Sequence, residues 1–114
     1  MSTDISLAVI GGTGLYALAE LQDIETHQPV TRYGAPSGPV RTGTLDGHRV
    51  AFLARHGEGH SVPPHRINYR ANLAALQALG GTRVLALNTV GGITERFGPR
   101  VLACPDQLID YTWG

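Results

Sequence analysis

Two kinds of hydrophobic pattern divide this 114-residue chain. Short continuous apolar runs at residues 7–10 and 83–87 are typical of buried strands. Between them, residues 40–45 and 48–53 flank an Asp-Gly pair at residues 46–47, which is typical of a type I′ hairpin turn. The pattern therefore predicts a β-sheet that contains these four segments.

Apolar positions at helical spacing predict helices in two places. Residues 68–79 are rich in alanine and leucine, and Gly80 and Gly81 follow them as a helix C-terminus requires. The many alanines indicate close packing against a sheet, and Asn68 is a candidate for the helix N-cap. A shorter helical pattern covers residues 15–21.

The remaining segments complete the predicted domain. Residues 22–39 are expected to form a loop, because their second half is dense in glycine and proline. Residues 101–103 and 107–111 indicate two further short strands. The whole predicts an α/β fold with a mixed central β-sheet flanked by helices, in a single domain spanning residues 1–114. Since no helix is left to cover the second face of the sheet, we expect this domain to be incomplete.

Composition excludes several classes of function. A formal net charge of zero argues against a general nucleic-acid binder. No apolar run approaches the ~20 residues that a membrane span needs, so we expect no membrane partner. Cys104 is the single cysteine, and the first seven residues lack the features of a signal peptide. These observations favour a cytoplasmic protein.

Polar chemistry gathers where three predicted strands end. A glycine-rich turn with a hydroxyl at Thr13 follows the first strand, Arg55 and His56 end the hairpin, and residues 88–92 follow the last strand. Loops at the carboxyl ends of strands are where α/β sheets bind ligands. Backbone N–H groups, hydroxyls and a fixed positive charge favour a small oxyanion such as phosphate.

Other interpretations of these residues stay open. The glycines at 11–14 also suit a plain turn between a strand and a helix, and Arg55 also suits an internal salt bridge or a solvated strand end. Residues 12–17 formally match the dinucleotide fingerprint G-x-G-x-x-A, but Arg32 and Tyr33 lie where its ribose-binding acid is expected. The chain has no lysine, which excludes a Walker-type phosphate site.

Three histidines raise the question of a metal. His56, His60 and His65 lie close together in sequence, but no cysteine accompanies them and they form no H-x-x-x-H pair on a helix. We therefore expect no metal site. His56 alone is as compatible with a structural role as with an anion contact, and His60 suits the lining of a pocket or a subunit contact.

Five co-linear motifs resemble those of the trimeric methylthioadenosine phosphorylase and purine nucleoside phosphorylase family. They occupy residues 10–15, 33–37, 53–57, 68–72 and 88–92, and the likeness continues to residues 107–112. Their order and spacing match from about residue 7 to the end of the chain. Within this family, residues 64–72 and the Asn-x-Val-Gly-Gly turn are most similar to bacterial S-methyl-5′-thioinosine phosphorylases.

The resemblance implies a pentosyltransferase of purine salvage. Inorganic phosphate would cleave S-methyl-5′-thioinosine to hypoxanthine and 5-methylthioribose 1-phosphate, with phosphate as co-substrate and no cofactor. A homotrimer is implied as well. Two alternatives stay open, namely an S-methyl-5′-thioadenosine phosphorylase and an inactive phosphate-binding fragment.

The resemblance also implies roles for particular residues, although it assigns no catalytic residue. The implied phosphate ligands are Thr13, Arg55, His56, Asn88 and Thr89, whereas Val90 and Gly91 match positions that line the base. The family often has alanine where this chain has Thr89. Family members are also much longer, so the acid that reads the purine is expected beyond Gly114, and the choice between a 6-oxo and a 6-amino purine stays open.

Overall fold

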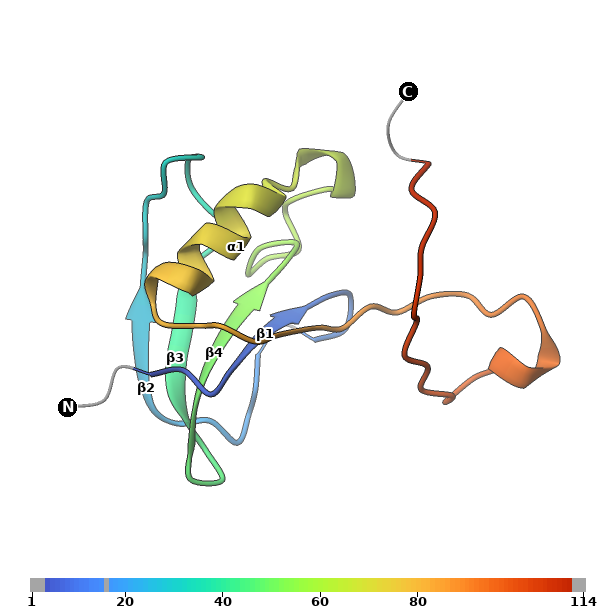
Figure 1. Ribbon diagram of the computed structural model, residues 1–114, viewed down its shortest axis with the longest axis horizontal. Helices are drawn as coiled ribbons and strands as arrows, with labels where there is room; N and C mark the ends of the chain where they lie inside the picture. The colour runs from blue at the N-terminus through green and yellow to red at the C-terminus, as the bar shows by residue number, and fades with distance from the viewer. Residues whose placement is uncertain (1–3, 16, 112–114) are drawn as a thin grey trace.

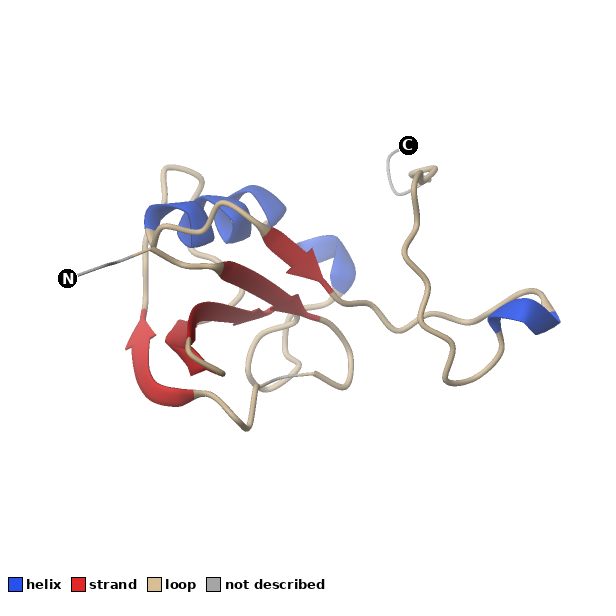
Figure 2. Ribbon diagram, turned by 60° about the horizontal axis from the view of Figure 1, so that its bottom comes forward, coloured by secondary structure: helices blue, strands red, loops and turns tan. Residues whose placement is uncertain are grey.

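The computed structural model describes residues 4–15 and 17–111. Within these residues, a mixed sheet has the strand order β2-β3-β4-β1-β5 (Figures 1 and 2). Its strands are β1 (Leu7–Gly11), β2 (Gln22–His27), β3 (Val40–Leu45), β4 (His48–Ala54) and β5 (Val84–Ala86). The helical segments are α1 (Tyr69–Ala78) and two short 3-10 helices, η1 (Pro64–Arg66) and η2 (Glu95–Phe97). The mixed sheet confirms the predicted fold class.

The central strand β1 decides where the strand ends lie. It pairs in parallel with β4 on one side and with β5 on the other. The hairpin partner β3 is antiparallel to β4, and β2 is antiparallel to β3. Because β4, β1 and β5 all run the same way, their carboxyl ends meet at one edge of the sheet.

The core lies on both faces of the sheet and follows the two-residue period of its strands. Along β4, Ala51 and Leu53 share one buried cluster with Ala75 and Leu76 of α1. Figure 1 shows α1 lying across this face. Phe52 belongs to a second cluster on the opposite face, which leucines from the connection between β1 and β2 cover.

The hairpin and α1 are confirmed in detail. Asp46 and Gly47 have φ values of 50° and 82°, and a type I′ turn requires positive φ at both positions. At the start of α1, the side chain of Asn68 accepts a hydrogen bond of 3.1 Å from the backbone N–H of Ala71. The helix ends where the N–H of Gly81 donates to the carbonyl of Leu76 at 2.9 Å, as in a Schellman motif.

The predicted helix at residues 15–21 is wrong for Leu15 and residues 17–21, while Tyr16 lies outside the described residues. Leu15 donates to the carbonyl of Gly12 and Leu21 to that of Leu18, so two separate turns replace the helix. Leucines three residues apart suit successive turns as well as a helix. Here their burial against the second core cluster decides the backbone.

The expected loop at residues 22–39 is wrong at its start, because Gln22–His27 forms β2. All its residues except Ile24 are polar and most are exposed, so no alternation of apolar side chains marks it. The pairing comes instead from the free edge of β3, and the register shifts between Gln22 and Glu25, beside a positive φ at Asp23. Residues 28–39 contain neither helix nor strand, as expected.

The end of the described chain departs most from expectation. β5 lies at its predicted position, but Val84 and Leu85 are each 45% exposed rather than buried. Residues 101–103 and 107–111 form no strand, so that prediction is wrong. Figures 1 and 2 show the segment after β5 leading away from the sheet, where no neighbouring strand offers backbone partners. Apolar pattern alone makes no strand without such partners.

Candidate functional site

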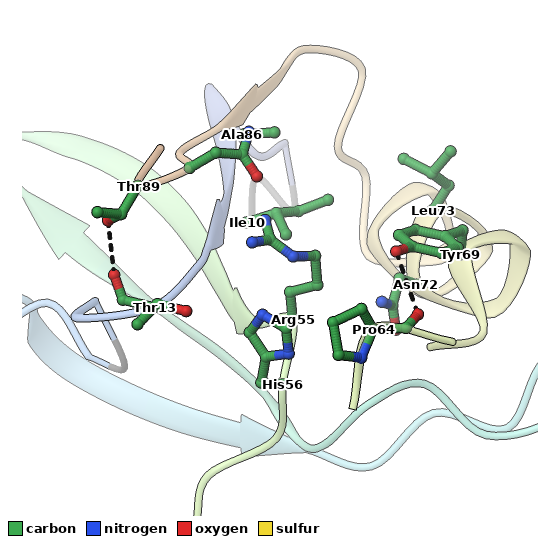
Figure 3. A pocket seen from close by; sticks show the side chains of 11 residues that line it. Ile10, Thr13, Arg55, His56, Pro64, Tyr69, Asn72, Leu73, Ala86 and Thr89 are labelled. Carbon is green, nitrogen blue, oxygen red and sulfur yellow. Dashed lines mark hydrogen bonds between the residues drawn. The ribbon is translucent and has the colours of Figure 1, made fainter. Parts of the chain in front are cut away.

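The ends of β1, β4 and β5 border a cavity of about 490 Å³ (Figure 3). Five of the residues expected to bind an anion line it, namely Thr13, Arg55, His56, Asn88 and Thr89. The predicted convergence of three strand ends is thus present in the structure. The other lining residues are Ile10, Pro64, Tyr69, Asn72, Leu73 and Ala86.

The register of the parallel strands explains this convergence. Gly11 is opposite Ala54 on β4, and Ile10 is opposite Ala86 on β5. Gly11, Ala54 and Ala86 are the last residues of their strands. Just beyond them, backbone N–H groups donate to carbonyls of the neighbouring strand β1. The N–H of Arg55 donates to Gly11 at 2.9 Å, and the N–H of Leu87 donates to Ile10 at 2.9 Å. The residues that follow are therefore held side by side.

The turn after β1 presents two oxygens of Thr13 in different directions. The N–H of Leu15 donates to the carbonyl of Gly12 at 3.0 Å, and Gly14 has a φ of 89°, as the third residue of a type II turn requires. The carbonyl of Thr13 accepts a 2.9 Å hydrogen bond from the Thr89 hydroxyl. Figure 3 shows the Thr13 hydroxyl pointing instead toward the side of the cavity where Arg55 lies.

Arg55 brings a positive charge to the cavity without a matching negative one. Its Nη1 donates a long hydrogen bond of 3.4 Å to the carbonyl of Leu87. No acidic side chain lines the cavity, and within the described part of the chain no ion pair includes Arg55. The alternative of an internal salt bridge is therefore wrong for these residues. A guanidinium in this state favours an anionic ligand.

His56 is buried, with 6% of its surface exposed, and the loop that follows it fixes its ring. The ring Nδ1 lies 2.9 Å from the carbonyl of Val62, and the N–H of Val62 donates back to the carbonyl of His56 at 2.9 Å. A carbonyl only accepts, so Nδ1 carries the hydrogen in this contact and Nε2 is left for other partners. His60 packs against this ring at 4.9 Å but does not line the cavity.

Two residues assigned to base recognition lie outside the cavity. Neither Val90 nor Gly91 lines it, and Val90 is 82% exposed. The sequence interpretation also missed the wall that α1 supplies, above all Asn72. This residue is 2% exposed, accepts from the N–H of Ser37 at 2.8 Å and donates to the Ser37 hydroxyl at 3.1 Å. The available signal was an amide among alanines, four residues after the N-cap Asn68 and hence on the same helix face.

Two alternatives considered from the sequence were a dinucleotide site and a metal site. In a dinucleotide site, a helix begins directly after the glycines and points its N-terminus at the pyrophosphate. In the described residues after Gly14, turns lead to β2 instead. Metal binding needs several ligands close together, and the described ranges 4–15 and 17–111 contain no group of three or more His, Cys, Asp or Glu residues that suits an ion. The same ranges contain no helix long and apolar enough to cross a bilayer.

Comparison with known proteins identifies relatives of the chain. Residues 6–114 match the family model described as the phosphorylase superfamily. The chain is 76% identical to a probable S-methyl-5′-thioinosine phosphorylase of Xanthomonas campestris pv. campestris, over 99% of this chain and 45% of the relative. It is 47% identical to an S-methyl-5′-thioadenosine phosphorylase of Hyperthermus butylicus, over 97% of this chain and 40% of the relative.

Solved structures of methylthioadenosine phosphorylases share the fold of this chain. A methylthioadenosine phosphorylase from an Antarctic soil metagenomic library superposes with a TM-score of 0.67 at 40% identity, over 75% of this chain and 30% of that one. A methylthioadenosine phosphorylase from Schistosoma mansoni gives a TM-score of 0.68 at 36% identity, over 73% of this chain and 30% of that one. The chain spans less than half the length of the curated relatives described above.

Proposed function

We propose, given that the chain belongs to the phosphorylase superfamily, that the longer protein is a purine nucleoside phosphorylase acting on S-methyl-5′-thioinosine. It would use inorganic phosphate to release hypoxanthine and 5-methylthioribose 1-phosphate. The 76% identity to a relative named for this activity supports the choice of substrate. Residues 1–114 would be the N-terminal portion of a single nucleoside-phosphorylase domain.

The observation that carries the proposal is the unmatched charge of Arg55 in a cavity without acidic residues. Arg55 is half-buried, and burying a cation costs free energy unless an anion or hydrogen-bond acceptors compensate it. Phosphate is compact, carries the opposite charge and accepts several hydrogen bonds. The donors around Arg55 come from three strand exits, which is more than a single surface arginine offers a passing ion.

The phosphate ligands that we propose are Thr13, Arg55, His56, Asn88 and Thr89. Held in this cavity, a phosphate oxygen would attack the anomeric carbon of the ribosyl group. The bond from that carbon to the purine nitrogen breaks, and its electron pair leaves with the base. The transition state has the character of a ribosyl cation, so an adjacent anion both stabilises its charge and stands in position to bond. Neither a metal nor a cofactor takes part in this scheme.

The remaining roles are also proposals. Val90 and Gly91 would line the purine, in a base site completed by residues outside the present cavity. The protein would act in the cytoplasm as a homotrimer, without nucleic-acid or membrane partners. A second candidate function, cleavage of S-methyl-5′-thioadenosine, is supported by the 47% identity to a relative with that name. The third candidate is an inactive fragment that binds phosphate without cleaving a nucleoside.

One assay separates these candidates. The full-length protein is incubated with S-methyl-5′-thioinosine or S-methyl-5′-thioadenosine, with and without phosphate, and the free base is quantified. We expect phosphate-dependent release of hypoxanthine at a much higher kcat/KM than release of adenine. Preferential release of adenine would move the substrate to the second candidate. No phosphate-dependent release from either nucleoside would contradict the enzymatic proposal.

A further inference from the structure

We propose that the Thr89 hydroxyl is a positioning group that acts on phosphate through Thr13 rather than by touching phosphate itself. This inference rests on the proposed function and refines it, because it divides the work of the two threonines. Thr13 would supply its hydroxyl to phosphate. Thr89 would hold Thr13 in the orientation that makes this possible, and any contact of its own with phosphate would come from its backbone.

The first observation is where the Thr89 hydroxyl hydrogen goes. It donates to the carbonyl of Thr13 at 2.9 Å, across 76 residues of sequence. A hydroxyl has a single hydrogen to donate. Because this hydrogen already bonds the carbonyl of Thr13, the Thr89 hydroxyl has none left to donate to an anion.

The second observation is the state of the Thr13 hydroxyl. Among the described residues, no hydrogen bond engages it, whereas the carbonyl of the same residue accepts one from Thr89. In Figure 3 the two oxygens diverge, with the carbonyl directed at Thr89 and the hydroxyl at the side of Arg55. The free donor of this turn thus points toward the side of the cavity that holds the positive charge.

The third consideration is the turn itself. The carbonyl of Thr13 belongs to the central peptide of the type II turn that Gly14 permits with its φ of 89°. Type I and type II turns differ in the orientation of this central peptide. The hydrogen bond from Thr89 holds one orientation. It also occupies a carbonyl oxygen whose partial negative charge would repel phosphate if it turned toward the cavity.

The position of Thr89 fits this task. It follows β5 by three residues, whereas Thr13 follows β1 by two, and these strands are parallel neighbours. Their exits therefore lie side by side, and the hydroxyl spans the gap between them. An alanine at position 89 would keep the backbone N–H but lose this bridge, and the turn after β1 would keep its own Leu15 to Gly12 hydrogen bond.

The test is a double-mutant cycle on the full-length enzyme, with KM for phosphate as the readout. We expect Thr89→Val to raise this KM about 3- to 10-fold, the range for one neutral hydrogen bond, and Thr13→Val to raise it at least as much. If Thr89 acts through Thr13, the double variant matches Thr13→Val, because nothing remains to be positioned. If the two hydroxyls contact phosphate independently, the two effects multiply, and that outcome overturns the inference.

Three further arms sharpen the result. Thr89→Ser keeps the hydroxyl and should restore the wild-type KM, whereas a KM as high as that of Thr89→Val would show that the hydroxyl is irrelevant. Thr94→Val is the matched control, because the Thr94 side chain makes no capping hydrogen bond and lies outside the cavity. Thr89→Ala replaces Thr89→Val if the latter fails to fold by circular dichroism. An unchanged phosphate KM in a folded Thr89 variant of an active enzyme overturns this inference alone, whereas a wild type without phosphate dependence overturns the proposed function with it.

Discussion

The guanidinium of Arg55 occupies space that only a glycine at position 12 leaves open. A Cβ atom placed on Gly12 would lie 2.6 Å from Nη2 of Arg55 and 2.6 Å from the carbonyl oxygen of Leu87. The same guanidinium contacts that carbonyl through Nη1. Gly12 therefore lies beneath the contact that joins the exits of β4 and β5, and its missing side chain fixes how closely Arg55 approaches the turn after β1.

The first prediction concerns this close approach. Gly12→Ala should raise the KM for phosphate, because the new Cβ forces the Arg55 guanidinium to move. The increase should correspond to the loss of at least one charged hydrogen bond, about 1.5–3 kcal/mol. Steady-state kinetics of the full-length protein measures the effect. Gly59→Ala is the control, since a Cβ there meets no atom within 4 Å. Equal phosphate KM values for the two variants would show that the position of Arg55 is unimportant.

The second prediction concerns the charge itself. Arg55→Ala should raise the KM for phosphate by a factor that corresponds to about 2–3 kcal/mol, because it removes the charged donors that face the cavity. Arg55→Lys should recover part of this loss, since an ammonium keeps the charge but not the planar fork. Arg83→Ala, at an exposed side chain just before β5, serves as the charge-matched control. A wild-type KM for phosphate in Arg55→Ala would contradict the proposed phosphate site.

The third prediction concerns the buried amide of α1. Asn72→Ala should lower the free energy of unfolding by about 1–3 kcal/mol, because it leaves the N–H of Ser37 without its buried acceptor. Urea unfolding of the full-length protein gives the value. Gln77→Ala changes an exposed amide on the same helix and should cost far less. Similar losses at the two positions would mean that helix propensity, and not the bond to Ser37, explains the result.

The fourth prediction separates stability from binding. Gly47→Ala places a side chain at a φ of 82° in the hairpin turn and should cost about 1 kcal/mol of stability. The hairpin turn lies at the opposite end of β4 from Arg55, so the phosphate KM should stay at the wild-type value. Thermal unfolding and kinetics on one preparation test both parts. A raised phosphate KM would show that strain in the turn reaches the cavity.

Much of this sheet was predictable, and the physical reason differs from element to element. The hairpin at residues 46–47 was found because its turn needs particular residues at particular φ values, which is a local requirement. The helix α1 was found because its apolar period, its N-cap Asn68 and its terminal glycines agree with one another. By contrast, β2 is polar except for Ile24 and pairs with a free strand edge, and such pairing leaves no trace in the local sequence.

In the site, too, some residues could be predicted from local sequence and others could not. Arg55, Thr13 and Asn88 were found because each follows an apolar run, and parallel strands bring such exits together. Asn72 was missed because its importance depends on a contact with Ser37, 35 residues earlier in the chain. The strands expected at residues 101–103 and 107–111 were wrong because apolar content predicts burial but does not supply a pairing partner.

The position of β1 between β4 and β5 couples ligand binding to the folding of the sheet. The cavity exists only when β1 has paired with β4, over 40 residues later, and with β5, over 70 residues later. Such distant pairings form slowly and together, because the entropy of closing long loops precedes any gain from the contacts. An anion bound at this edge would then favour the complete sheet by mass action. If that anion is phosphate, as proposed above, the thermal unfolding temperature of the protein should rise with the phosphate concentration of the buffer.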